Sequence, residues 1–493
     1  MGLKKQMLTE KQLWLDDPYE VESIWYPSFS VKGPKPSRKD YRHHGKLTYT
    51  PSKGAFLQLY HDDVSLNWFD NMIYGGEGDS SWYDKITCLG ISTHSGTKKS
   101  TIFRVGSVFR GFHLPDPESS NILKLEFSIK HLNQWLKETG FKFNRNIKKN
   151  AFTIRYKGRS GRWLKLSDFF DFKISTSAWL PHEVKDYGKI ETREHVVFEL
   201  RGRNNTPRKY SDFISLLDPI LDFFTLASLD CANPFNIGVT GDFGYIDGFD
   251  GTKVPASATV TLSPIAMSNR IFEAKKYDFL FCEEDLEKPL QFYLKNWLKK
   301  YRLVRTPFSL YNSAIYAEKH VDTKFLLFSQ AVESYHRRFR RGYYLPESDF
   351  RSQVLEPLYK VIPAQLDRNF KESLKNRLRY SNEYSLRKRI KDLIDENENI
   401  LKRYFKVPSD LANRIADARN QLTHLQEANH GIKLNSLVFY NTVLKKLFEL
   451  SLLREIGFEQ DKISILTKAC ESFRFLVLQR YKSSRNVMRR VDN

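Results

Sequence analysis

The hydrophobic pattern of this chain changes its period near residue 284, and the change divides the 493 residues between two kinds of structure. Up to that point, short runs of β-branched and aromatic residues partly alternate with polar ones and are separated by Gly- and Ser-bearing turns, as in strands. Beyond it, apolar residues recur every three or four positions, as they do on one face of a helix. The sequence therefore predicts an α+β multidomain protein, with a β-rich N-terminal module followed by an all-α helical bundle.

The N-terminal part is expected to form an antiparallel sandwich or barrel-like module, because many short strands follow one another with little helix between them. The expected strands are Phe56–Tyr60, Lys85–Ser92, Thr101–Phe109, Leu123–Ile129, Ala151–Tyr156 and His195–Leu200. Helices are expected at His131–Glu138 and at 210–230. The glycines of 231–270 do not spell a phosphate-binding G-x-G-x-x-G loop, so we interpret them as tight turns between strands.

The C-terminal part is expected to be a bundle. Its predicted helices are Asp322–Arg338, Phe350–Val361, Phe370–Tyr380, Ser385–Tyr404, Asp410–Gln426, Asn435–Glu455 and Asp461–Tyr481. The patterns together place a β-rich module at 1–283, a helical linker at 284–309, the all-α domain at 310–481 and a basic tail at 482–493.

Positive charge is concentrated in the helical part. The chain carries 79 Lys and Arg against 58 Asp and Glu, a formal net charge of +21. Residues 301–493 hold 36 of the basic and 22 of the acidic residues, so two-thirds of the excess lies in the last two-fifths of the chain. Such an excess indicates an anionic partner, either a nucleic acid or a membrane surface.

The densest basic stretch runs from Lys371 to Lys391. We predict that it binds RNA through Lys371, Lys375, Arg377, Arg379, Arg387, Lys388, Arg389 and Lys391. Tyr380 and Tyr384 are interleaved with these cations, and aromatic rings can stack on unpaired bases. A solvated helix face is the alternative interpretation of the same charges.

Several other classes of protein find no support. Four cysteines in 493 residues are too few for a disulfide framework, and none of them forms a C-x-x-C pair, which argues against a structural zinc site. No metal or cofactor is expected. The most apolar window, Phe213–Leu229, is interrupted by Asp218, Pro219 and Asp222, so we interpret it as a core helix rather than a membrane span. The N-terminal MGLKKQMLTE lacks the apolar run of a signal peptide, so we expect a cytoplasmic protein.

The expected helix Asp410–Gln426 carries a candidate catalytic set. Its buried stripe is predicted to comprise Leu411, Ile415, Ala418, Leu422 and Leu425. Off that stripe lie Arg419, Asn420 and His424. Asn420 and His424 are four positions apart and therefore share one face of the helix.

These residue types suit RNA cleavage, because RNA carries its own nucleophile in the ribose 2′-OH. A histidine that titrates near neutral pH can transfer the protons. An arginine supplies a fixed charge with the fork geometry that phosphate oxygens accept, and no metal ion is required. On spacing alone, a surface ion pair or a core-edge position is the more frequent role of such residues. The all-α setting and the basic excess favour catalysis.

The string Arg419-Asn420-Gln421-Leu422-Thr423-His424 resembles the R-x4-6-H motif of HEPN-domain ribonucleases, in its R-N-x-x-x-H form. The segment Phe325–Phe339 looks like the early HEPN helix that packs beside the motif helix, and Glu333 lies where that family often has a polar residue near the site. The resemblance covers roughly 310–480. A β-rich module placed before such a domain resembles the ApeA-type antiphage proteins.

The resemblance implies a homodimer whose two motif helices face each other across one composite cleft. It implies metal-independent cleavage that leaves a 2′,3′-cyclic phosphate and a 5′-hydroxyl, with Arg419 and His424 as the catalytic pair and Asn420 and Glu333 in support. The expected role is abortive antiphage defence by cutting host RNA, with tRNA as the expected substrate. The N-terminal module is then a sensor or regulator, with a phage protein as its trigger.

Two alternatives remain open at this stage. The first is a non-catalytic RNA-binding HEPN scaffold, since some HEPN domains serve as partners rather than enzymes. The second is an enzymatic site in the N-terminal module, although that part contains no G-x-S-x-G, no H-E-x-x-H and no recognisably spaced pair of catalytic carboxylates. A membrane role for the basic tail at 482–493 is weaker than a role near an RNA site.

Overall fold

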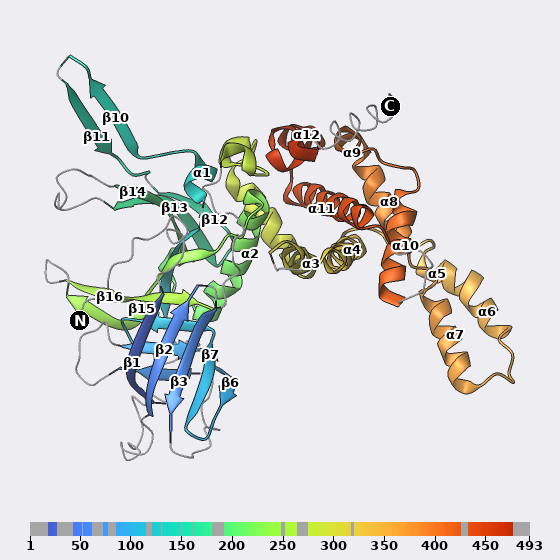
Figure 1. Cartoon of the computed structure of the whole chain (residues 1–493), viewed down its shortest axis with the longest axis horizontal. Coiled ribbons are helices and arrows are strands. Elements are labelled where there is room, and N and C mark those ends of the chain that lie inside the picture. The colour runs from blue at the N-terminus through green and yellow to red at the C-terminus, as the bar shows by residue number, and fades with distance from the viewer. Residues whose placement is uncertain are drawn as a thin grey trace, which may run out of the picture. The chain divides into compact units, whose positions relative to one another are not determined.

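The computed structural model describes residues 18–26, 43–51, 53–61, 72–76, 85–114, 121–129, 131–148, 150–159, 161–179, 192–247, 252–263, 275–316, 320–424 and 432–476. The chain divides into two compact units, 1–295 and 296–493, which are described in turn. The first is β-rich and the second is helical (Figure 1), which confirms the predicted fold class.

The first unit is built on one antiparallel sheet. Its 14 described strands are β1 (Tyr19–Tyr26), β2 (His43–Thr50), β3 (Gly54–Tyr60), β4 (Met72–Gly75), β5 (Ile86–Leu89), β6 (Ser92–Gly96), β7 (Ser100–Val105), β8 (Ser107–Arg110), β9 (Ile122–Ile129), β12 (Arg162–Lys165), β13 (Phe170–Trp179), β14 (Arg193–Gly202), β15 (Pro234–Asp247) and β16 (Lys253–Leu262). Their order is β12-β13-β14-β9-β15-β16-β8-β5-β4-β1-β2-β3-β7-β6. The two outermost described strands, β12 and β6, do not pair, so the described sheet is continuous but not closed as a barrel would be.

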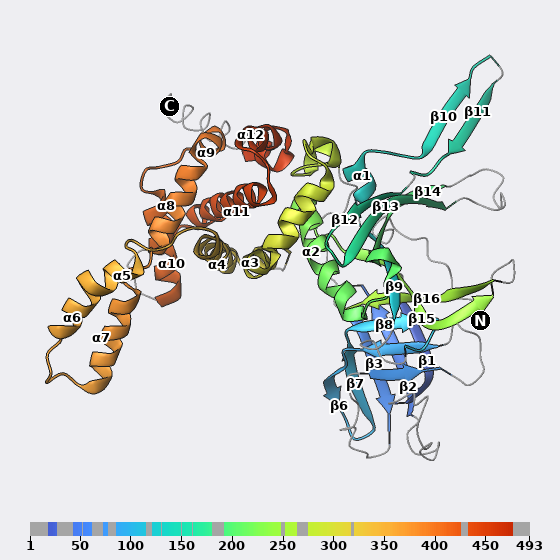
Figure 2. The same cartoon turned by 180° about the vertical axis from the view of Figure 1, so that it is seen from behind.

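Two hydrophobic cores form on this sheet. The first gathers around Trp25, with Leu47, Leu57, Phe103 and other buried side chains of β1 to β8. The second lies under α2 (Tyr210–Ser228), where the ring of Phe224 is 5.1 Å from Phe198 of β14 and 5.2 Å from Trp135. Figure 2 shows α2 lying along the sheet. The apolar window Phe213–Leu229, which the sequence predicts to be a core helix, therefore lies almost entirely within α2.

The remaining strands, β10 (Phe141–Asn146) and β11 (Ala151–Tyr156), form a separate two-stranded sheet. They follow the short helix α1 (Leu132–Leu136) and extend away from the large sheet (Figures 1 and 2). One predicted strand, Thr101–Phe109, is in fact two, β7 and β8. The break falls at Gly106, whose backbone N–H donates to the carbonyl oxygens of Leu89 and Gly90 at 2.9 and 3.1 Å.

The second unit is helical. Its helices are α3 (Leu290–Tyr316), which begins in the first unit, α4 (Val321–Phe339), α5 (Glu347–Phe350), the π-helical turn η6 (Arg351–Leu355), α6 (Glu356–Lys360), α7 (Arg368–Tyr380), α8 (Leu386–Glu396), α9 (Glu398–Tyr404), α10 (Leu411–His424), α11 (Leu434–Ile456) and α12 (Gln460–Ala469). Short 3-10 turns lie at Arg203–Asn205, Lys276–Asp278 and Glu283–Asp285 in the first unit. No described helix is long and apolar enough to cross a membrane.

Two predicted helices are interrupted. Ser385–Tyr404 divides into α8 and α9 at Asn397, a fully buried residue whose side-chain amide donates to the Leu393 carbonyl at 2.8 Å. The predicted helix Asp461–Tyr481 breaks at Cys470, whose backbone is extended. The segment predicted as a linker, 284–309, falls largely on α3, which continues without interruption across the boundary between the units.

Helix α11 lies at the centre of the bundle and is buried on nearly all sides. Phe448 packs against Tyr311 of α3, with ring centroids 5.1 Å apart, and against Tyr335 of α4 at 6.0 Å. Its polar residue Glu449 is fully buried and accepts hydrogen bonds from Tyr311 Oη and Lys446 Nζ, both at 2.8 Å. Polar contacts of this kind fix which helices meet, because a buried charge must find its partner.

Gly75 and Gly238 offer a matched test of the packing around Trp25. A Cβ added to Gly75 of β4 would lie 2.5 Å from the Trp25 ring, whereas one added to Gly238 of β15 meets nothing within 4 Å. We expect Gly75→Ala to lower the free energy of unfolding by about 1–3 kcal/mol, as overpacking does. Gly238→Ala should change it by less than about 1 kcal/mol. Urea denaturation of both variants measures the difference, and equal losses would contradict the packing described.

The buried Glu449 makes the helical unit sensitive to acid. Burial alone would raise the pKa of Glu449, but Lys446 and Lys445 beside it hold that pKa below its ordinary value of 4.5. The stability that this carboxylate contributes is therefore present above pH 4.5 and is lost as the pH falls through the lower pKa of the folded state.

We expect Glu449→Gln to destabilise the helical unit by about 3–5 kcal/mol at pH 7, because the Lys446 ammonium would be left buried without a counter-charge. The control is Glu398→Gln, which removes an exposed carboxylate paired with Lys402 at 2.7 Å and should cost less than about 1 kcal/mol. Helical circular dichroism during denaturation reads out both. If the stability of the unchanged protein did not depend on pH below 4.5, the lowered pKa of Glu449 would be contradicted.

Candidate functional site

The motif helix α10 is half embedded in the bundle. It begins after Pro408, whose carbonyl accepts the Leu411 N–H at 3.1 Å, and it packs against α8 and α4. Its buried side chains are Leu411, Ala412, Ile415, Ala416 and Ala418. The predicted burial is therefore confirmed for the first three residues of the stripe, Leu411, Ile415 and Ala418. Leu422 is only half-buried, and Leu425 lies outside the described residues.

No side chain described after Ala418 on α10 is buried, so the motif lies where the helix emerges from the bundle. Arg419 is half-buried and its Nη1 donates to Asn420 Oδ1 at 3.3 Å. Thr423 Oγ1 donates back to the Arg419 carbonyl at 2.9 Å. His424 is the last residue of α10, and its side chain is outside the described part of the chain. Arg419 and Asn420 thus lie together at the surface of the bundle.

Glu333 belongs to a network of charges on α4. Its carboxylate accepts two hydrogen bonds from Arg337, at 3.0 and 3.2 Å, and Arg337 also pairs with Glu383. The side chain of Glu333 is one-fifth exposed. The described contacts of Glu333 do not include Arg419 or Asn420.

Sequence reasoning missed a buried histidine next to this network. His336 of α4 is 1% exposed, its Nε2 is 3.3 Å from the Asp392 carboxylate, and its Nδ1 is 3.2 Å from Arg389 Nη1. Because a guanidinium can only donate, Nδ1 accepts and the ring proton is placed on Nε2, towards Asp392. Burial and the nearby Arg389 lower the pKa of His336, so the ring stays neutral. In the sequence, His336 is a single histidine in a helical stripe, and nothing around it indicates that it pairs with Arg389 and Asp392.

One of the predicted RNA-binding cations, Arg389, is buried. Arg389 of α8 is 1% exposed, and its Nε donates to the Tyr384 carbonyl at 2.9 Å. A Cβ added to Gly342 would lie 2.7 Å from its guanidinium, so the backbone there closes over it. Helix periodicity turns every third or fourth residue of a basic stretch inward, and here the inward cation is satisfied by His336, the Tyr384 carbonyl and Glu383.

The other predicted RNA-binding cations are on α7 and α8. Lys375, Arg377 and Arg379 of α7 and Arg387 and Lys391 of α8 are exposed, whereas Lys371 and Lys388 are half-buried. Lys388 pairs with Asp392 at 2.6 Å, and Arg387 lies 3.5 Å from Asp417 of α10. The pair Arg387–Asp417 places the basic side of α8 beside the motif helix.

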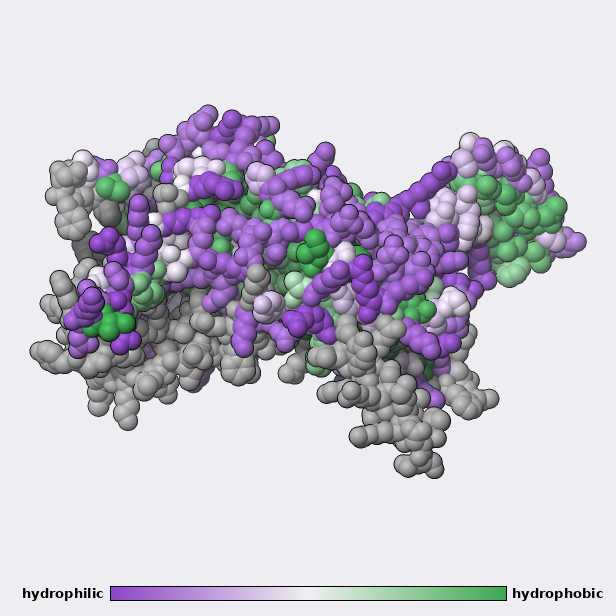
Figure 3. All heavy atoms as spheres, turned by 90° about the horizontal axis from the view of Figure 1, so that it is seen from above, coloured by the Kyte–Doolittle hydropathy of each residue, from purple (hydrophilic) through white to green (hydrophobic). Residues whose placement is uncertain are grey.

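Helices α6 and α7 form an arm with no buried side chain among their residues. Figure 3 shows apolar side chains gathered on this arm, where the exposed residues include Leu358, Val361, Phe370 and Tyr380. Helix α7 is capped by Asp367, whose Oδ1 accepts from the N–H groups of Asn369 and Phe370 at 2.8 and 3.1 Å. The arm therefore presents cations and aromatic rings on an ordered helix.

Two observations on the described part of the chain concern possible metal ligands. Among the described residues, no group of three or more His, Cys, Asp or Glu side chains is placed to hold a metal ion. The four cysteines are buried thiols that form no disulfide.

Within the helical unit, a family model described as Apea-like HEPN matches residues 326–462, which contain most of α4 and all of α8, α10 and the motif. A second model, described as ApeA N-terminal domain 1, matches residues 23–297, more than half of the chain. The chain therefore belongs to the ApeA-like HEPN proteins, a family of antiphage defence proteins. No curated protein and no solved structure matches it.

The contrast between Arg389 and Arg387 can be tested directly. Arg389→Ala removes the partner of His336 Nδ1 and of the Tyr384 carbonyl, and should lower the free energy of unfolding by about 2–4 kcal/mol. Arg387→Ala, two positions away and exposed, should change stability by less than about 0.5 kcal/mol. Thermal denaturation measures both effects. If Arg389→Ala left stability intact and weakened RNA binding, Arg389 would belong to the RNA surface after all.

Proposed function

We propose that the protein is a metal-independent endoribonuclease that cuts host RNA, with tRNA as the expected substrate, in abortive antiphage defence. The observation that carries this proposal is the Arg419-Asn420-x-x-x-His424 motif at the surface-exposed end of α10, within the region matched by the HEPN family model. A reaction on cytoplasmic tRNA also agrees with the cytoplasmic location expected from the sequence.

The proposed reaction is attack of the ribose 2′-OH on the adjacent phosphorus. The 2′-O–P bond forms, the P–O5′ bond breaks, the 2′-OH proton leaves to a base and the 5′-oxygen gains a proton. His424 carries out proton transfer, for which a histidine titrating near neutral pH is suited. The products are a 2′,3′-cyclic phosphate and a 5′-hydroxyl.

Arg419 is proposed to stabilise the negative charge that develops on the phosphate oxygens. Its hydrogen bond to Asn420 Oδ1 supports this role, because it restricts where the guanidinium points and so reduces the entropy lost on binding phosphate. Glu333 acts through Arg337, which it holds on the α4 surface, and is therefore proposed as a positioning residue rather than a catalytic one.

The active form is proposed to be a homodimer through the HEPN domain, with one motif from each copy lining the cleft. Support comes from the end of α10, where side chains are left uncovered by the bundle, and from the first turns of α11, where Leu434 and Val438 are exposed. Exposed apolar side chains are often buried when two protein subunits associate.

The exposed cations of α7 and α8 are proposed to hold the RNA backbone. Tyr380, which is well exposed, can stack on an unpaired base. Tyr384 is less suited, because its ring packs edge-on against Tyr344 at 4.7 Å. The N-terminal unit is proposed as the sensor or regulator of the nuclease, with a phage protein as its trigger.

The test is incubation of purified protein with total tRNA in EDTA, followed by mapping of the cut ends. We expect cleavage to persist in EDTA and to leave cyclic phosphate ends. His424→Ala and Arg419→Ala should each reduce the rate by at least about 10²-fold, because each removes a group acting on the transition state.

The matched control is Arg414→Ala, which removes another arginine of the same helix. Arg414 is exposed and its Nε donates to Asp410 at 2.8 Å, so its loss should leave cleavage unchanged. Undiminished cleavage by the His424→Ala protein would refute the proposal. Salt-dependent RNA binding without turnover in the unchanged protein would instead support the non-catalytic scaffold.

A further inference from the structure

The hairpin of β10 and β11, residues 141–156, is an arm of the first unit that no other described strand covers; we refer to it as the β-arm. A two-stranded ribbon alone is marginally stable and usually packs against something. Most of its side chains are nevertheless exposed, including Phe143 at 65% and Phe152 at 60%. Large exposed apolar surfaces of this kind mark binding sites.

The two faces of the β-arm differ in chemistry. The register pairs Phe141 with Tyr156, Phe143 with Ile154 and Arg145 with Phe152, and residues that pair point to the same face. One face therefore carries four aromatic rings, Ile154 and one arginine. The rings form a row, with centroids 4.9 Å apart for Phe141 and Tyr156, 6.4 Å for Phe141 and Phe143, and 6.0 Å for Phe143 and Phe152.

The β-arm is also strongly basic. Residues 141–157 contain no Asp or Glu, and their cations are Lys142, Arg145, Lys148, Lys149, Arg155 and Lys157. On the second face, Lys142 pairs directly with Arg155, an arrangement that like-charge repulsion makes unfavourable. Neither side chain forms an ion pair with a residue that the structure describes. A polyanion would relieve that repulsion.

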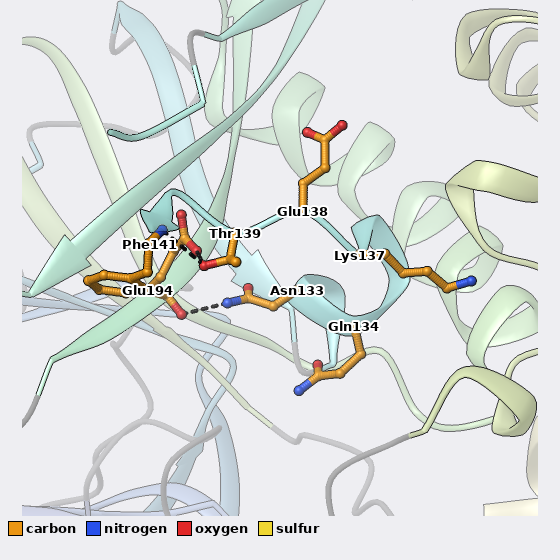
Figure 4. A pocket seen from close by; sticks show the side chains of 7 residues that line it. All are labelled: Asn133, Gln134, Lys137, Glu138, Thr139, Phe141 and Glu194. Carbon is orange, nitrogen blue, oxygen red and sulfur yellow. Dashed lines mark hydrogen bonds between the residues drawn. The ribbon is translucent and has the colours of Figure 1, made fainter. Parts of the chain in front are cut away.

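The root of the β-arm is held firmly. The Glu194 carboxylate of β14 accepts from the Gly140 N–H at 2.9 Å and from Thr139 Oγ1 at 2.7 Å, and the Asn133 amide donates to the Glu194 carbonyl at 2.6 Å (Figure 4). Tyr156 Oη donates to Thr176 of β13 at 3.4 Å. The row of rings is thus attached to the large sheet through fixed contacts.

A shallow cavity of about 330 Å³ lies at this root, and Phe141 forms part of its wall. Most of its polar groups are already used. Lys137 pairs with Glu284, and Glu194 and Asn133 bind the backbone. These side chains therefore mainly attach the β-arm to the rest of the unit. Binding is therefore to be sought along the exposed rings rather than in the cavity.

We propose that the aromatic face of the β-arm binds an unpaired stretch of nucleic acid, with bases stacked on Phe143, Phe152 and Phe141 and phosphates held by the flanking cations. Rings with a positive charge beside them are how proteins hold single strands, because every base offers a face for stacking. Neighbouring bases in a stacked strand are about 3.4 Å apart, so a strand on these rings is opened to match their 6.4 Å separation.

Two other occupants fit the surface less well. A second copy of this chain carries a net charge of +21, and two β-arms without carboxylates would repel each other. A lipid surface is best met by an apolar tip. The sequence between β10 and β11 instead reads Ile147-Lys148-Lys149-Asn150, with a single apolar residue, while the rings lie along the strands.

The experiment uses the full chain and two probes of about 16 nucleotides, oligodeoxythymidine and 2′-O-methyl-oligouridine, a length within the range of known single-strand sites. Both lack the 2′-OH that the proposed nuclease needs, so binding is read without cleavage. Fluorescence anisotropy is measured at raised salt, which weakens binding by the cations of the helical unit more than stacking. The two probes distinguish DNA from RNA as the natural source.

We expect Phe143→Leu with Phe152→Leu to weaken binding at least about tenfold, since each lost stacking contact weakens binding severalfold or more. Phe143→Trp should bind as the unchanged protein does, because it retains an aromatic face. Thr153→Ala, an exposed change on the opposite face, is the matched control and should have no effect. A photoreactive 5-iodouracil placed in the probe should crosslink to peptides within 141–157.

Unchanged affinity of the double leucine variant, with its fold verified by circular dichroism, would overturn the proposal. So would crosslinks confined to the helical unit. Ring-dependent binding to phosphatidylserine vesicles but not to either oligonucleotide would identify a membrane surface instead. A change in mass on light scattering caused by the leucine substitutions would identify an interface between copies. None of these outcomes depends on whether Arg419 and His424 cleave RNA.

Discussion

The helical unit depends on two carboxylates of α11 that are placed inside the bundle. Glu449 binds Tyr311 of α3, and Glu455 accepts from Tyr335 of α4 at 2.8 Å and from Arg340 at 3.0 Å. Apolar packing alone would allow helices to slide against one another, since many arrangements bury similar areas. A buried carboxylate that must meet its donors removes that freedom. With α3, α4 and α11 fixed, α8 and α10 have a defined surface on which to pack, and the motif of α10 emerges at a defined place.

Charge thus has two distinct uses in this unit. Arg389 and His336 are drawn into the interior, where each satisfies the other and the histidine stays neutral. Arg387 and Lys391, from the same helix, face solvent. A net charge counts both kinds equally, yet only the outward cations attract a polyanion at useful strength. The basic excess of the helical part is consequently a weaker guide to RNA contacts than the exposure of individual side chains.

The sequence predicted the fold class and most helices, because a change of hydrophobic period survives in any tertiary context. It could not predict the break at Asn397 or the one at Cys470, since each depends on how a side chain or backbone fits between other helices. It also placed the first half of the α10 stripe correctly and overextended it, because periodicity does not reveal where a helix leaves the bundle. The pairing of His336 with Arg389 joins residues 53 positions apart, which no local pattern encodes.

In the β-arm, averaging the net charge over a long stretch of sequence hides a local concentration of cations. Spread over the first 300 residues, a small basic excess looks too dilute to indicate a nucleic acid. The fold gathers cations into one hairpin and, by alternation along two paired strands, sorts four rings onto one face. Neither step is visible in composition, since Phe141 and Phe143 meet Tyr156 and Phe152 only once the register is known.

The two surfaces also rely on different physics. The contacts proposed for the cations of α7 and α8 are electrostatic and would weaken steeply with salt, whereas the stacking proposed for the β-arm is far less sensitive to salt. A protein with both can hold RNA backbone with one unit and distinguish unpaired from paired strands with the other, because a duplex offers phosphates but keeps its base faces closed.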